Sequence, residues 1–274
     1  MNPLVIYHAG CPDGFCAAWV ARKALGEVEV YPAKHGDPPP PVQGRDVYVV
    51  DFSYPRTVME RMAKDAASLR VFDHHKTAEA DLAGLPFCVF NMHESGASLT
   101  WRTLLPNAEL PWLVQYVRDR DLWLWQLPHS REVSAAVMAM PHDFAAWDAM
   151  AARSAEDAVL HGRAIRDHIE HYIASVLPMT FPVELDGIKM ACVNVPYPNI
   201  SDVLDAICKA GTPAALGFYW SRDRWAYSLR SVGDLDISVL AKKRGGGGHK
   251  NAAGFASGCV LIHEVQVAMA KAQA

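Results

Sequence analysis

The first part of the chain alternates short apolar runs with amphipathic stretches, and this alternation constrains the fold more than any other sequence feature. Apolar runs predict buried strands at 4–7, 28–31, 47–50 and 69–72. Amphipathic stretches predict helices at 14–25, 55–67, 95–105 and 110–117. Strands that alternate with helices are typical of a parallel sheet covered by helices. We therefore expect an α/β fold that begins with a parallel-sheet domain.

A long amphipathic stretch separates this part from a second set of strands and helices. Apolar residues recur at helical spacing from 155 to 177, and Pro178 and Pro182 end the pattern. Further strands and helices are expected at 189–195, 201–210, 214–220, 225–231 and 237–243. We therefore expect an N-terminal domain at 1–177, which includes a long connecting helix, and a smaller α/β C-terminal domain at 187–274.

Composition excludes several classes of protein. The formal net charge of -4 and the pI of 6.3 argue against a protein that coats nucleic acid nonspecifically. No basic leader and no long apolar stretch is apparent, so we expect a cytoplasmic protein without a membrane partner. The cysteines form no Cys-x-x-Cys pair, which indicates neither a zinc ribbon nor a disulfide scaffold: they are Cys11, Cys16, Cys88, Cys192, Cys208 and Cys259.

Three of the four early apolar runs end in residues that can bind metal ions. His8 and Asp13 follow the first run, and Asp51 follows the third. Asp73, His74 and His75 follow the fourth run directly. The carboxyl ends of parallel strands share one edge of a sheet, so the clusters should converge there. Carboxylates and imidazoles suit divalent manganese, iron or zinc. A carboxylate that bridges two such ions would give the two-metal geometry of in-line phosphoryl transfer.

The order of these residues resembles that of the DHH phosphoesterase superfamily. The later segments 228–231 (Ser-Leu-Arg-Ser) and 245–255, with four glycines followed by His-Lys-Asn-Ala-Ala-Gly-Phe, resemble the C-terminal domain associated with that family. The two motifs together cover nearly the whole chain. The resemblance implies a metal-binding catalytic domain at 1–177, a substrate-binding domain at 187–274, and manganese-dependent cleavage of phosphoanhydride or phosphodiester bonds.

The resemblance also implies a role for each matching residue. His8 and Asp13 would hold one metal ion, and Asp51 would bridge. Asp73 and His74 would complete the cluster, while His75 would orient the phosphate or a ligand. The implied catalytic residues are Asp51, His74 and His75.

The family's fourth metal-site carboxylate follows a helix beyond the signature. Here Asp119 and Asp121 compete for that place, and we prefer Asp119 because it comes first after the apolar run 113–117. Asp121 is then a surface residue in an ion pair.

The first motif departs from the family pattern, which usually has two aspartates one residue apart. Only Asp13 is present, and either Cys11 or Phe15 occupies the other position, depending on how the motif is aligned. One carboxylate is lost either way, which leaves open whether one or two metal ions bind. Cys11 as a replacement ligand would favour zinc or iron over manganese, whereas the alternative is that it only packs.

The glycine tract and its neighbours are the expected substrate-binding residues. Consecutive glycines allow backbone N–H groups to converge on an anion, and adjacent cationic side chains could grip phosphate. The residues expected to do so are Arg230, Ser231, Gly246, Gly247, Gly248, His249 and Lys250. Trp123 and Trp125 could stack a nucleobase or belong to the core.

We therefore expect a phosphoesterase that uses one or two manganese ions. The favoured substrate is a short oligonucleotide or a nucleotide with a terminal phosphate, since a mildly acidic chain lacks the basic track that long nucleic acid requires. Alternative substrates are a cyclic dinucleotide, polyphosphate or phosphoadenosine phosphate. A nucleotide-binding sensor without catalysis is the alternative from another class. A homodimer is left open.

Overall fold

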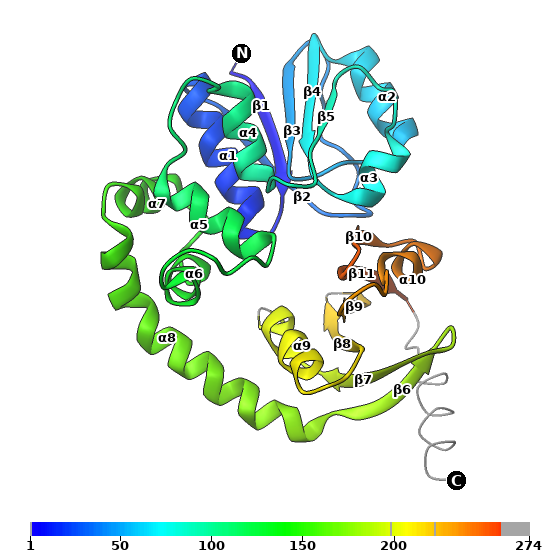
Figure 1. The fold of residues 1–274 in the computed structure, drawn as a ribbon. Helices are drawn as coiled ribbons and strands as arrows, with labels where there is room; N and C mark the ends of the chain where they lie inside the picture. The colour runs from blue at the N-terminus through cyan, green and yellow to red at the C-terminus, as the bar shows by residue number, and fades with distance from the viewer. Residues whose placement is uncertain (1, 198, 222, 259–274) are drawn as a thin grey trace. The chain divides into compact units, whose positions relative to one another are not determined.

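Figure 1 shows the chain in the computed structural model, which describes residues 2–197, 199–221 and 223–258. The chain divides into two compact units, of which the first ends at Arg166 and the second begins at Asp167. Helix α8 (Ala155–Val176), which matches the expected connecting helix, contributes to both. Within the described ranges, no helix is both long and apolar enough to cross a lipid bilayer.

The first unit is built on five parallel strands in the order β2-β1-β3-β4-β5. The parallel sheet predicted from the alternation is therefore confirmed. The strands are β1 (Leu4–His8), β2 (Glu29–Ala33), β3 (Asp46–Val50), β4 (Ser68–Asp73) and β5 (Cys88–Phe90). Strand β5 was not predicted, because a strand of three residues is too short to show a pattern.

Helices cover both faces of this sheet, because alternate side chains of a strand point to opposite sides. Val5 and Tyr7 pack in one apolar cluster, whereas Leu4 and Ile6 pack in the other. Figure 1 shows α1 and α4 on one side of the sheet and α2 and α3 on the other. The helices are α1 (Pro12–Leu25), α2 (Arg56–Asp65), α3 (Lys76–Asp81), α4 (Gly96–Leu104), α5 (Trp112–Asp121), α6 (Ser130–Met138) and α7 (Phe144–Ala151). The short helices α3, α6 and α7 were not predicted.

The second unit contains a mixed sheet of six strands in the order β10-β11-β9-β8-β7-β6. The pair β7 and β8 is parallel, with α9 (Ile200–Lys209) as the crossover, and the remaining pairs are antiparallel. Apolar clusters lie on both faces of the sheet. The elements are η1 (Leu177–Met179), β6 (Phe181–Leu185), β7 (Ile188–Asn194), β8 (Ala214–Ser221), β9 (Arg224–Ser231), α10 (Ser238–Lys243), β10 (Gly247–His249) and β11 (Ala252–Ser257).

The glycine tract forms a hairpin strand, so the predicted nest of converging N–H groups is corrected. The Gly246 N–H donates to the carbonyl of Ala241, and Gly247 and Gly248 run in β10 against β11. Backbone groups that pair with β11 in this hairpin are not available to an anion. The glycines instead permit close contact between neighbouring segments of the backbone: a Cβ at Gly246 would lie 2.0 Å from the Gly254 carbonyl oxygen.

Candidate metal centre

The sheet register brings the predicted ligands together. Tyr7 pairs with Val50, and Val50 pairs with Phe72, across the adjacent strands β1, β3 and β4. The residues that follow these three positions are His8, Asp51 and Asp73, which therefore lie side by side at the carboxyl edge. The convergence expected from the sequence is what the structure shows.

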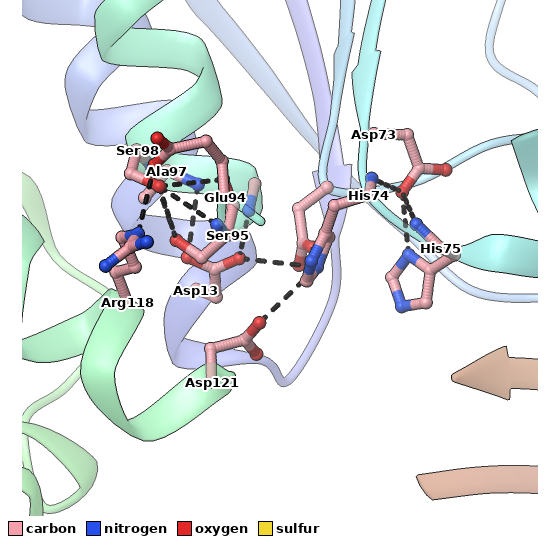
Figure 2. A network of polar contacts seen from close by, with 12 residues as sticks. Asp13, Asp73, His74, His75, Glu94, Ser95, Ala97, Ser98, Arg118 and Asp121 are labelled. Atoms are coloured by element: carbon pink, nitrogen blue, oxygen red, sulfur yellow. Dashed lines mark hydrogen bonds and ion pairs between the residues drawn. The ribbon is translucent and has the colours of Figure 1, made fainter. Parts of the chain in front are cut away.

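Asp13 enters the site from the first turn of α1 and is fixed by the start of α4. Its carboxylate is 2% exposed and accepts hydrogen bonds from the N–H groups of Gly96 (2.6 Å) and Ala97 (3.1 Å), as Figure 2 shows. The N-terminus of a helix favours a negative charge, so α4 stabilises the ionised form of Asp13. Ser95 is the N-cap of α4, and Ser95 and Ser98 form a capping box.

Asp51 lies at the centre of the site in a strained backbone conformation. Its φ is 54°, which is uncommon for a residue other than glycine, and such strain tends to occur at functional sites. Two glycines make room for it: a Cβ at Gly96 would lie 2.3 Å from the Asp51 Cβ, and a Cβ at Gly14 would lie 3.1 Å from Asp51 Oδ2. Its Oδ1 is 3.1 Å from His74 Nε2, and its Oδ2 is 3.6 Å from His8 Nδ1.

Asp73 holds the two histidines that follow it. Its carboxylate accepts hydrogen bonds from Ser53 Oγ (2.5 Å), the His74 N–H (2.7 Å) and His75 Nδ1 (2.7 Å). Burial opposes ionisation, but the His75 charge and the donors keep the pKa of Asp73 below its usual range. A carboxylate in this position fixes the orientation and tautomer of the imidazole.

Asp121, and not Asp119, reaches the cluster, so the preference for Asp119 is corrected. Asp119 is 3% exposed and accepts hydrogen bonds from the Gln126 N–H (2.9 Å) and Ser130 Oγ, which close the turn after α5. The Oδ2 of Asp121 lies 3.4 Å from His74 Nε2, and Figure 2 shows the side chain directed toward His74. Helix α5 extends to Asp121, and residues two apart on a helix point to different sides.

The electrostatics of the cluster fit a bound cation. Nε2 of His74 lies within 3.1, 3.4 and 3.8 Å of oxygens of Asp51, Asp121 and Asp13. Burial and neighbouring carboxylates raise the pKa of Asp13, and burial raises that of Asp121. Burial opposes a charge on His74, but Asp121 and Asp51 raise its pKa to about 10. Burial likewise opposes a charge on Asp51, but His74 and His8 hold its pKa well below the usual range.

Buried carboxylate oxygens without a donor mark where such a cation would fit. Among the described residues, Oδ2 of Asp51 and Oδ2 of Asp121 are buried and accept no hydrogen bond. An unsatisfied buried oxygen costs free energy unless a cation or another donor meets it. Within the first unit, three sets of residues each have donor atoms within 4.8 Å of one another: His8, Cys11 and Asp51; Asp13, His74 and Asp121; and Asp51, Asp73 and His75. The donor set and the burial therefore fit divalent metal ions.

The two alternatives for the missing aspartate are now distinguishable. Phe15 is 3% exposed and packs in the apolar cluster around α1, with its ring 5.7 Å from that of Tyr7. Cys11 lies beside His8 and Asp51. Cys11 therefore occupies the place that the structure offers for the missing ligand.

In the second unit, the register places Arg230 and His249 on one face of the sheet. Arg230 of β9 and His249 of β10 each pair with Ala252 of the strand between them, β11. Directly paired residues of antiparallel strands have their side chains on the same face of the sheet. Ser231 Oγ donates to the Leu235 carbonyl (2.6 Å), and Lys250 Nζ lies 2.9 Å from Asp234. The hydroxyl of Ser231 thus supports the chain, and the side chains of Arg230 and His249 lie on a common face of the sheet.

Trp123 and Trp125 lie in the turn beyond Asp121 and are outside the core clusters. Both have positive φ, of 57° and 56°, and their ring centroids are 5.0 Å apart. The Arg120 guanidinium lies 5.2 and 5.5 Å from the two rings, and that of Arg131 lies 4.1 Å from Trp125. These contacts account for the tryptophans as an aromatic–arginine cluster.

Comparisons with known proteins support the same fold. No family model matches the sequence. An uncharacterized protein of Acanthamoeba polyphaga mimivirus is 26% identical over 295 residues, which cover 96% of this chain and 70% of that protein.

Three solved structures resemble the chain at low sequence identity. An exopolyphosphatase-related protein from Bacteroides fragilis has a TM-score of 0.55 and 13% identity, with 98% of this chain and 92% of that chain covered. The pGpG-specific phosphodiesterase PggH from Vibrio cholerae has a TM-score of 0.52 and 14% identity, with 97% and 96% covered. RecJ from Thermus thermophilus, in complex with Mn²⁺, has a TM-score of 0.54 and 13% identity, with 99% and 52% covered. All three are DHH-domain proteins, and this chain has the fold of the DHH-family phosphoesterases.

Proposed function

We propose that the chain is a metal-dependent phosphoesterase of the DHH type. The observation that carries the proposal is the convergence of Asp13, Asp51, His74 and Asp121 at the carboxyl edge of the sheet, with buried oxygens that no donor satisfies. Buried carboxylates around one imidazole are costly in a protein that has no use for a cation. Two fold neighbours support the same chemistry, since one is a phosphodiesterase and the other is a manganese-bound RecJ.

The proposed ligands are His8, Asp13, Asp51, His74 and Asp121, with Asp51 between two metal positions. A divalent ion bound there would neutralise charge on the phosphate oxygens and acidify a water molecule for in-line attack. Manganese is the cofactor proposed for the group of Asp13, His74 and Asp121, because these donors are oxygen and imidazole nitrogen.

The surrounding residues position these groups. The N–H groups of Gly96 and Ala97 hold Asp13, while Asp73 accepts from His75 Nδ1 and thereby fixes the ring. We propose that His75 contacts the phosphate or a metal ion from this fixed position, and that Asp73 acts mainly through His75. The strained φ of Asp51 keeps its carboxylate directed into the cluster.

The proposed substrate is a short oligonucleotide or a nucleotide with a terminal phosphate. The net charge of -4 argues against binding long nucleic acid through many phosphate contacts. Arg230 and His249 share a sheet face, and together they offer a cationic donor and an imidazole to a phosphate group. One fold neighbour is specific for pGpG, which belongs to the same chemical class of substrate. The cytoplasm is the proposed location.

Hydrolysis assays test this proposal directly. The full chain is freed of metal with a chelator, supplied with manganese, and offered dinucleotides, cyclic dinucleotides, polyphosphate and phosphoadenosine phosphate. Hydrolysis of a 5′-phosphorylated dinucleotide, lost with Asp51→Asn and retained with the exposed control Asp65→Asn, is the expected result. Binding of nucleotide without metal uptake or turnover would show that the chain is a sensor and overturn the proposal.

A further inference from the structure

Cys11 stands at the one point of the first motif where an aspartate is missing. It precedes α1 as the N-cap residue, with an extended backbone (φ -107°, ψ 127°), and its side chain makes no capping hydrogen bond. Pro12 follows in the first turn, where its fixed φ is compatible with a helix. The thiol is therefore held at a strand-to-helix junction without a structural task in capping.

The packing of Cys11 also differs from that of the other described cysteines. Four of them lie in or against an apolar cluster: Cys16, Cys88, Cys192 and Cys208. Cys11 belongs to none of these clusters, and it is only partly buried. Ordinary apolar packing, which explains the others, does not explain its position.

A second observation points to a ligand at this position. The Oδ2 atom of Asp51 lies 3.6 Å from His8 Nδ1 and accepts no hydrogen bond from any described residue. Asp51 is 1% exposed, so water does not readily satisfy this oxygen. One donor atom each of His8, Cys11 and Asp51 lies within 4.8 Å of the others, which is close enough for one ion to contact all three.

We propose that Cys11 binds a divalent metal ion as a thiolate, together with His8 and Asp51. The inference rests on the proposed phosphoesterase function. On coordination the thiol loses its proton to solvent, and a sulfur–metal bond forms without any oxidation or reduction. A set of one sulfur, one nitrogen and one oxygen donor favours zinc, iron(II) or cobalt(II) over manganese. The group of His8, Cys11 and Asp51 would therefore prefer a different ion from the group of Asp13, His74 and Asp121.

Cobalt(II) titration of the metal-free full chain tests the proposal. A cobalt–thiolate bond gives a near-ultraviolet charge-transfer band, which oxygen and nitrogen ligands do not give. We expect the band in the wild-type chain and in Cys16→Ala, which removes a buried thiol from the same helix. We expect no band in Cys11→Asp or Cys11→Ser. Cys11→Asp should also shift the preference from zinc toward manganese by about tenfold or more.

Alkylation gives a readout that needs no variant. Burial and the neighbouring Asp51 raise the pKa of the Cys11 thiol, so the labelling is done at alkaline pH. Iodoacetamide should then label Cys11 in the metal-free chain, and zinc should protect it, as peptide mapping by mass spectrometry would show. Binding of cobalt that Asp51→Asn abolishes, but that shows neither the band nor protection of Cys11, would overturn the thiolate ligand and leave the phosphoesterase proposal standing. Failure of the chain to bind any divalent ion would overturn both.

Discussion

The charged side chains that we compare in the two units differ in burial. At the carboxyl edge of the first sheet, Asp13, Asp51, Asp73 and His74 are between 0 and 2% exposed and contact one another. In the second unit, Lys250 is partly exposed and pairs with an exposed aspartate. Buried charges that crowd together are costly, whereas exposed ion pairs contribute little to stability. The difference fits the proposal that the first unit binds a metal ion and the second recognises the substrate at its surface.

The comparison has an energetic consequence that mutations can test. Removal of a buried carboxylate relieves repulsion, so the fold should tolerate substitutions that abolish activity. Removal of a surface group in the second unit should instead weaken substrate binding with little change in turnover.

The largest effect is expected for Asp51→Asn. Turnover should fall at least several hundredfold, about 3–4 kcal/mol of transition-state stabilisation, because the variant loses the carboxylate shared by two donor groups. Asparagine tolerates the positive φ at this position, so the chain should still fold. Steady-state hydrolysis and circular dichroism measure the two effects, with Asp65→Asn as control. Near-normal activity in the folded variant would remove Asp51 from the site.

Substitutions at Asp121 and Asp119 distinguish a carboxylate that binds metal from one that stabilises the fold. Asp121→Asn should lower metal affinity about 10- to 100-fold, with little loss of stability. Asp119→Asn should retain metal affinity but lose about 1–3 kcal/mol of unfolding free energy, because it weakens the bonds to Gln126 and Ser130. Isothermal titration with manganese and urea unfolding separate the two. The reverse assignment would restore Asp119 as the ligand.

These residues also show how far sequence reasoning reaches. The convergence of His8, Asp51 and Asp73 could be predicted, because parallel strands fix which ends meet. The choice between Asp119 and Asp121 could not, because it depends on where α5 ends and which side of its last turn faces His74. Apolar periodicity predicts that a helix or strand exists more reliably than it predicts the residue at which it ends.

The glycine tract and Asp13 are two further cases in which the local sequence does not decide the structure. The tract at 245–248 is compatible with a nest and with a close-packed hairpin, and only the position of β11 decides between them. The N–H groups that hold Asp13 come from residues more than eighty positions away, and a capping sequence alone does not reveal their partner. Contacts set by tertiary packing leave no local pattern.

An intermediate effect is expected for Arg230→Ala and His249→Ala. Each should lower kcat/KM about ten- to two-hundredfold on a 5′-phosphorylated dinucleotide, mainly through a higher KM, because a charged hydrogen bond to phosphate is lost. The loss should shrink on an aryl phosphodiester, which has no terminal phosphate. Equal losses on both substrates, carried by kcat alone, would place these residues at the reacting phosphorus and break the division between the two units.

The smallest effect is expected for Asp148→Asn, far from any proposed ligand in sequence. Lys23, Trp19 and Arg22 contact the Asp148 carboxylate and lower its pKa to about 2. The Asp148 side chain is 34% exposed, so solvent screening limits the contribution of its ion pairs to the unfolding free energy to about 1 kcal/mol or less. Because the folded pKa lies below the unfolded value of about 3.9, this contribution is present above pH 4 and is lost as the pH falls toward 2.

Urea unfolding of the wild-type chain and Asp148→Asn, measured at pH 7 and at pH 3, tests this expectation. The difference in unfolding free energy should be largest at pH 7 and narrower at pH 3, while hydrolysis per folded molecule stays unchanged. A surface ion pair that should stabilise the fold without affecting turnover is the counterpart of Asp51, whose substitution should abolish turnover and spare the fold. A pH-independent difference would mean that the asparagine acts through lost packing on Trp19, and a loss of activity would mean that the catalytic edge depends on contacts well outside the metal cluster.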